Sequence, residues 1–158
     1  MKITSIKITF LMLTLFVAVF GSRAADDLSV DVTTTPTFKA FLKNYVTAIN
    51  SKDRAELNEC IQAKSVAMMA EDQKLSDYWF GNRFKHLIPA DIRVRATAIP
   101  TDKPLPFANY GIVFPVRPTY QVQISYMPTP TNGVNIVLWV VSENDKWYEV
   151  VPSAPKKN

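Results

Sequence analysis

The sequence predicts an α+β fold in which two or three N-terminal helices pack on an antiparallel sheet. Apolar side chains recur at helical spacing from residue 35 onward, and after Pro89 they alternate with polar ones, as in half-buried strands. Of the 158 residues, 134 follow the first 24, which suits one domain with its own core. We expect this single domain at 35–152, between a flexible leader (25–34) and a flexible tail (153–158).

The first 24 residues have the pattern of a signal peptide. An uncharged run from Ile8 to Phe20 follows two lysines, and small residues stand at Ser22 and Ala24. The run of thirteen residues is shorter than the roughly 20 that a membrane helix needs. We therefore expect cleavage after Ala24 and a periplasmic or secreted product with no stable membrane insertion; a retained membrane anchor is the alternative.

Charge and cysteine content narrow the range of partners. Without residues 1–24 the chain has 15 basic and 14 acidic residues, a net charge of +1 rather than +4. The remaining basic residues are spread along the chain rather than clustered, so no nucleic-acid partner is predicted. Cys60 is the only cysteine and cannot form an internal disulfide; we expect a small buried side chain, with an intermolecular disulfide or a reactive thiol as the alternative.

The first predicted helix begins at Thr35-Pro36, a hydroxyl N-cap followed by proline in the first helical position. Its apolar positions have helical spacing: Phe38, Phe41, Leu42, Tyr45, Val46 and Ile49. A polar break at 50–53 caps a second, short helix. A third helix is expected near Asp72 to Phe80, ending at Gly81, while the segment before it has only weak helical spacing.

Strands are predicted in the second half of the chain, at 92–98, 120–126, 134–141 and 146–151. Asn132-Gly133 provides a turn between the second and third, and residues 142–145 provide the next turn. Five prolines keep the segment 100–118 in loops, edges or bulges, with a short edge strand at Tyr110–Val116 as an option.

This order of elements resembles the nuclear transport factor 2-like superfamily, also called the cystatin-like cone fold. The features that carry the resemblance are the helix at 38–45, the Asn50-Ser51-Lys52-Asp53 break and the closing hairpin of 137–141 with 146–151. The resemblance implies a strongly curved antiparallel sheet wrapped around the helices, with an apolar cavity between them. The superfamily includes isomerases, cyclases and binding modules, so the fold alone does not select a function.

Aromatic residues are the predicted lining of that cavity. Tyr45, Trp79, Tyr120 and Tyr126 are expected to form a ligand pocket for a small apolar molecule, because their polar tips need partners when buried. Packing in the core is the alternative for all four.

An apolar stripe of Val137, Trp139 and Val141 is predicted on the outer face of the sheet. It is expected either to form an interface in a homodimer or to be covered by the chain itself.

Two carboxylates are candidates for catalysis. Asp77 or Asp91 would act as the proton-transfer base of a ketosteroid-isomerase-like or polyketide-cyclase-like enzyme, with a tyrosine as donor. A solvated helix face and a strand-entry cap are the respective alternatives. His86, the single histidine, is expected in solvent near a helix end.

No metal or cofactor is predicted, because one histidine and one cysteine do not make a transition-metal site and no glycine-rich phosphate loop is present. The sequence thus predicts an exported, non-catalytic domain that binds an unidentified protein or a small apolar ligand, with the enzyme as the alternative.

Overall fold

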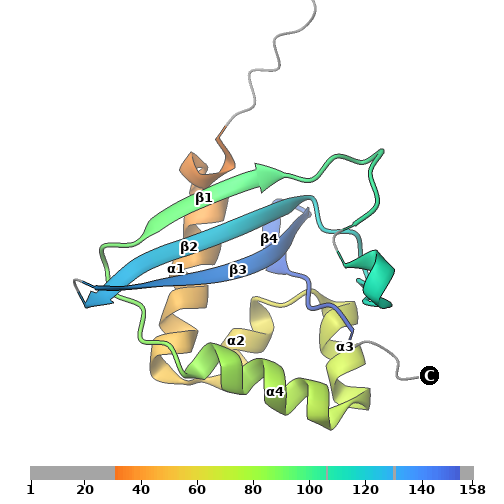
Figure 1. Cartoon of the computed structure of the whole chain (residues 1–158), viewed down its shortest axis with the longest axis horizontal. Helices are drawn as coiled ribbons and strands as arrows, with labels where there is room; N and C mark the ends of the chain where they lie inside the picture. The colour runs from red at the N-terminus through yellow and green to blue at the C-terminus, as the bar shows by residue number, and fades with distance from the viewer. Residues whose placement is uncertain (1–30, 106, 130, 154–158) are drawn as a thin grey trace, which may run out of the picture.

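The computed structural model of the chain describes residues 31–105, 107–129 and 131–153. Within these residues it has four α-helices and one four-stranded antiparallel sheet with the strand order β1-β2-β3-β4 (Figure 1). The predicted α+β class is therefore confirmed. The predicted signal peptide (1–24) lies outside the described residues, as do 25–30 of the leader and 154–158 of the tail. None of the described helices is long and apolar enough to span a bilayer.

Folded structure is present before the expected start at Thr35. Val32–Thr34 forms a short 3-10 helix, η1, which is capped by the carboxylate of Asp31. The side chain of Val32 is buried in the core, so this part of the expected leader belongs to the folded domain.

The first two helices follow their predicted caps. Helix α1 (Pro36–Ser51) begins where the Thr35 hydroxyl accepts a hydrogen bond from the Phe38 N–H, with proline in the first helical position. Helix α2 (Arg54–Glu59) begins after Asp53, whose carboxylate accepts two main-chain hydrogen bonds of the first turn.

Helix α3 (Ala63–Glu71) is the additional helix, formed where the sequence has only weak helical spacing. Helix α4 (Gln73–Phe84) continues past Gly81, so the predicted end of the third helix is wrong by one turn. Glycine inside a helix costs about 1 kcal/mol relative to alanine. The extra turn offsets that cost through Phe84, whose ring packs on Phe80, and through an ion pair of Arg83.

The sheet is a meander of β1 (Arg93–Ala98), β2 (Tyr120–Thr129), β3 (Asn132–Glu143) and β4 (Lys146–Glu149). Each of the four predicted strands is present, with different ends. The β3–β4 turn consists of Asn144 and Asp145, which have φ angles of 52° and 60°. Two consecutive positive φ angles are typical of the type I′ turn that joins two-residue hairpins, and asparagine and aspartate tolerate them.

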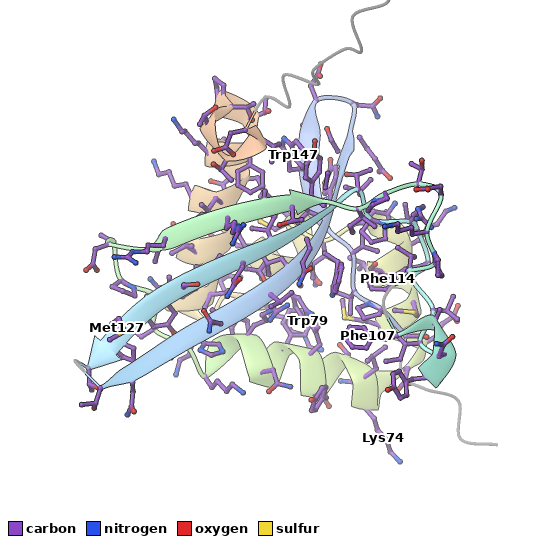
Figure 2. All side chains as sticks on the ribbon, turned by 45° about the horizontal axis from the view of Figure 1, so that its top comes forward. Lys74, Trp79, Phe107, Phe114, Met127 and Trp147 are labelled. Atoms are coloured by element: carbon purple, nitrogen blue, oxygen red, sulfur yellow. The ribbon has the colours of Figure 1, made fainter. Side chains whose placement is uncertain are left out.

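The core lies between the sheet and the helices. Figure 2 shows Trp79 between α4 and the sheet. The inner sheet face contributes side chains that are no more than 2% exposed: Val122, Ile124, Ile136, Leu138 and Val140. Tyr45 and Phe38 of α1 are completely buried against this face. Side chains therefore fill the space for which the sequence predicted an apolar cavity.

The connection between β1 and β2 covers part of the outer sheet face. It contains a 3-10 helix, η2 (Ala108–Tyr110), and no strand is present at Tyr110–Val116, so that optional edge strand is a wrong prediction. Phe114 of this connection packs on Trp139 with ring centroids 5.5 Å apart, and it shares a second cluster with Val141 and Val150.

Candidate functional site

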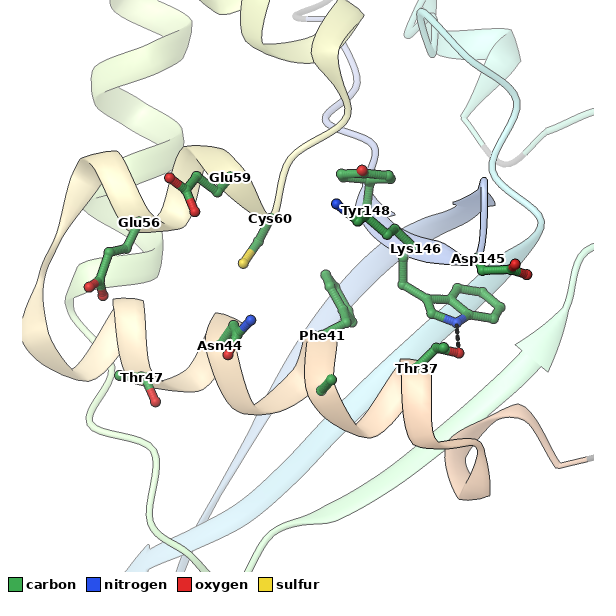
Figure 3. Close-up of a pocket in the computed structure, with 12 residues that line it drawn as sticks. Thr37, Phe41, Asn44, Thr47, Glu56, Glu59, Cys60, Asp145, Lys146 and Tyr148 are labelled. Carbon is green, nitrogen blue, oxygen red and sulfur yellow. Dashed lines mark hydrogen bonds between the residues drawn. The ribbon is translucent and has the colours of Figure 1, made fainter.

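A groove of about 860 Å³ lies between α1, α2 and the β4 hairpin (Figure 3). Helix α1 contributes Thr37, Ala40, Phe41, Asn44 and Thr47. The other walls come from Glu56, Glu59 and Cys60 of the α2 segment and from Asp145, Lys146, Trp147 and Tyr148 of the hairpin. The volume is in the range of pockets that hold small ligands or parts of a partner chain.

Trp147 joins two walls of the groove. Its indole Nε1–H donates to the Thr37 hydroxyl at 3.2 Å, which links β4 to the first turn of α1 (Figure 3). Its ring also packs edge-on against Phe38 and Tyr120, with centroids 5.4 and 5.7 Å away. These contacts hold the two walls at a fixed separation.

The rim of the groove is mainly acidic. The carboxylates of Glu56, Glu59 and Asp145 and the ammonium of Lys146 line it, and all four residues are exposed. None of the four forms an ion pair with another described residue. The groove therefore presents a net negative charge to a ligand.

Cys60 lines the groove but is only 6% exposed. Burial, with the nearby Glu149, Glu59 and Glu56 carboxylates, raises the pKa of its thiol to about 11. The thiol is thus protonated at neutral pH, and a protonated thiol is a weak nucleophile.

A buried charge network lies behind the groove. The Tyr45 hydroxyl of α1 donates to Glu149 Oε2 at 2.6 Å, and the Arg83 guanidinium of α4 donates to Glu149 Oε1 at 2.5 Å. Glu149 is 2% exposed and Tyr45 is fully buried. Arg83 also donates to the Val137 carbonyl at 3.1 Å, and its guanidinium carbon lies 5.3 Å from the ring centroid of Trp79.

Burial and charge act differently on the members of this network. Burial is the main cause that raises the pKa of Tyr45 well above that of a free phenol; Arg83 opposes this effect and Glu149 adds to it. Burial by itself lowers the pKa of Arg83, but the Glu149 carboxylate outweighs it, so the net direction is upward. Both side chains keep their usual protonation states, and the network acts as a neutral clamp between helices and sheet.

Sequence reasoning missed both charged residues of the network. A sequence signal for Glu149 exists: it stands two residues from both Trp147 and Val151, so a strand that directs these apolar side chains inward directs Glu149 inward too. The structure pairs Glu149 with Val140, which is buried. A signal for Arg83 exists too, because it follows Trp79 by four residues on the same helix face. A helix that ends at Gly81, as the sequence predicts, does not include Arg83.

The four predicted pocket residues do not share one cavity. Tyr45 is in the charge network, Trp79 is 8% exposed under Arg83, and Tyr120 packs on Trp147. Tyr126 lines a second hollow of about 500 Å³ at the far end of the β2–β3 hairpin. None of the four is among the lining residues of the groove.

The two candidate catalytic carboxylates lie apart from the groove. The Asp77 side chain is 59% exposed, pairs with Arg54 at 3.5 Å and accepts a hydrogen bond from Gln73. Asp91 is exposed at the second hollow, where the nearby Tyr126 hydroxyl contacts His86 Nδ1 at 3.1 Å. Neither carboxylate is hydrogen-bonded to a tyrosine within the described residues.

His86 is partly buried beside that tyrosine rather than free in solvent. Burial and the adjacent Lys85 and Arg83 lower the pKa of its imidazole.

The predicted outer stripe is largely covered. Trp139 lies under Phe107 and Phe114, and Val141 is 7% exposed, while Val137 is 37% exposed. Figure 2 shows Phe107 and Phe114, both in the β1–β2 connection, on the same side of the molecule. Among the described residues, no three histidine, cysteine, aspartate or glutamate side chains come together as a metal site would require.

Comparison with protein families, with curated protein sequences and with solved structures gives no match to this chain.

Proposed function

We propose that this chain is an exported, non-catalytic binding module whose partner occupies the groove between α1, α2 and β4. The proposal includes a periplasmic or secreted location, on the strength of the signal-peptide pattern in residues 1–24. It also includes the cone fold of the nuclear transport factor 2-like superfamily, which the packing of helices on an antiparallel meander supports.

The groove itself is the observation that carries the proposal. It combines aromatic side chains (Phe41, Trp147 and Tyr148) with charged groups that have no ion-pair partner in the described part of the chain. Aromatic side chains together with a few charged groups that have no ion-pair partner are typical of binding sites. The charge network and the Trp147–Thr37 bond brace its walls from behind, so a partner would meet a preorganised surface.

The chemistry of the groove favours binding over catalysis. Its sulfur nucleophile, Cys60, is buried with a pKa of about 11. The carboxylates considered for an isomerase, Asp77 and Asp91, lie outside the groove and are exposed. For these reasons we do not extend the proposal to an enzyme.

A photocrosslinking experiment tests the proposal. Benzoylphenylalanine replaces Asn44, which lines the groove, or Lys43, its exposed neighbour on α1 that does not. In cells that export the chain, we expect a discrete adduct from position 44 and none from position 43. Ala40→Trp, which fills the groove from α1, should abolish the adduct without changing the far-ultraviolet circular dichroism.

Two outcomes would overturn the proposal. One is the absence of any adduct at position 44, together with native mass spectrometry that shows neither ligand nor partner on protein purified from its own envelope. The other is an adduct whose yield is the same with Ala40→Trp, because that adduct would form outside the groove.

A further inference from the structure

We infer that the groove receives an extended peptide segment with a basic side chain, which adds as a short strand to the open edge of β4. The inference rests on the proposed function and specifies the chemistry of the partner. It follows from the main-chain hydrogen bonds of β4 and from the charge of the rim.

At one end of β4, the main-chain groups that point away from β3 are already hydrogen-bonded to another segment of the chain. The Glu149 N–H donates to the Cys60 carbonyl at 2.8 Å, and the Gln62 N–H donates to the Glu149 carbonyl at 2.9 Å. Ile61 thereby forms a parallel bridge with Glu149. The segment after α2 thus acts as a one-residue strand beside the end of β4.

The same edge is open two residues earlier. In an antiparallel pair, successive residues direct their main-chain groups alternately toward and away from the partner strand. Since Glu149 directs its groups away from β3, Trp147 does so as well, and no described residue bonds to its N–H or C=O. An unpaired edge of this kind is a template for an added strand.

The groove lies at this open position. The residues that precede Cys60 form α2 and not a strand. No described segment therefore extends the parallel pairing of Ile61 and Glu149 to the position alongside Trp147. Trp147, Cys60 and Phe41 all line the groove, and Figure 3 shows Phe41 and Cys60 between α2 and the β4 hairpin. A short extended segment placed there would continue the strand that the Ile61 bridge begins.

Charge indicates the composition of that segment. The groove lining includes three carboxylates, those of Glu56, Glu59 and Asp145, but only one ammonium, that of Lys146. A lysine or arginine on the added strand would balance this excess. The other sheet edge, on β1, carries the exposed Arg93 and Arg95. Charged side chains on an edge strand disfavour the addition of another strand.

The test uses the purified, ¹⁵N-labelled chain and the capped peptide Thr-Val-Lys-Val-Thr. One control peptide has glutamate in place of lysine, and another has N-methyl groups on alternate residues, which removes the main-chain donors. We expect the lysine peptide to slow hydrogen exchange of the Trp147 amide at least tenfold. The Tyr148 amide, which already faces β3, should change little. The N-methylated and glutamate peptides should leave Trp147 unprotected.

A charge variant tests the basic side chain separately. Glu59→Gln with Asp145→Asn removes two rim charges, and asparagine keeps the positive φ angle of position 145 accessible. At low salt we expect lysine-peptide binding to weaken about fivefold. The matched control, Glu71→Gln with Asp102→Asn, removes two exposed charges outside the groove and should change binding less than twofold.

The outcomes distinguish the inference from the proposed function. An adduct at position 44 with no Trp147 protection by any peptide overturns strand addition and leaves the binding groove intact. Protection of β1 amides instead of Trp147 also overturns it, as does formation of β4-to-β4 dimers detected by sedimentation. Without any adduct at position 44, and with neither ligand nor partner in native mass spectrometry, the proposed binding groove is overturned, and strand addition is overturned with it.

Discussion

Glu149 connects three parts of the molecule: α1, α4 and the segment that follows α2. Its carboxylate binds Tyr45 of α1 and Arg83 of α4, while its main-chain groups bind Cys60 and Gln62. A buried carboxylate is tolerated only with such partners, because desolvation of an unpaired charge costs several kcal/mol. One residue at the end of β4 thus aligns the elements that form the groove.

Replacement of this carboxylate should be severe. Glu149→Gln leaves the Arg83 guanidinium without its anion, so we expect the free energy of unfolding to fall by about 3 kcal/mol in urea denaturation. Tyr45→Phe removes one hydrogen bond to a charged group and should cost about 1.5 kcal/mol. Exposed Glu71→Gln is the matched control and should be neutral. A loss below 1 kcal/mol for Glu149→Gln would show that the clamp is not an important source of stability.

The contacts of its last turn fix helix α4 in place. Gly81 interrupts the run of side chains, and an added Cβ at this position would meet no atom within 4 Å apart from the nearby backbone of its own helix. The helix nevertheless continues to Phe84, because the final turn carries Arg83 to its buried partner.

Gly81→Ala should therefore stabilise the protein by about 0.5–1 kcal/mol, since alanine reduces the entropy lost when the helix forms. The contrasting variant is Gly111→Ala, where φ is +70° and a Cβ is strained, so its stability should fall. Thermal unfolding followed by circular dichroism measures both. If Gly81→Ala were destabilising, the continuous helix through this residue would be in doubt.

The elements differ in how far local sequence predicts them. Local sequence predicts the start of helix α1 to the residue, because Thr35 and Pro36 are local signals and the apolar period is strong. It does not predict the last turn of α4, because Glu149, the stabilising partner of Arg83, lies 66 residues away along the chain. The groove also has no local signal. It forms because the chain reaches the β4 edge only after α2 has ended, and only the three-dimensional arrangement places these segments together.

The β1–β2 connection determines which part of the outer sheet face is accessible to another molecule. Phe107 and Phe114 lie over Trp139, and Phe114 belongs to the same cluster as Val141. A homodimer through the outer sheet face would have to displace this connection. The covered stripe is therefore a second small core rather than a free docking surface.

Uncovering the stripe should change the association state. Phe107→Ala with Phe114→Ala removes both rings, with an expected cost of about 3 kcal/mol, mostly from the buried Phe114. Sedimentation velocity should show a monomer for the unchanged chain and concentration-dependent association for the double variant, whose Trp139 is exposed. Phe107→Ala alone, at a half-exposed ring, is the control. Association of the unchanged chain would instead place a dimer contact on another surface.

The buried sulfur of the groove has a consequence for the periplasmic or secreted location that we propose. With a pKa of about 11, only about one Cys60 side chain in ten thousand is a thiolate at pH 7. Disulfide exchange and peroxide oxidation both proceed through the thiolate, so this cysteine should stay reduced among proteins that are forming disulfides. A partner in the groove would therefore not form a disulfide with Cys60, and its binding would stay non-covalent.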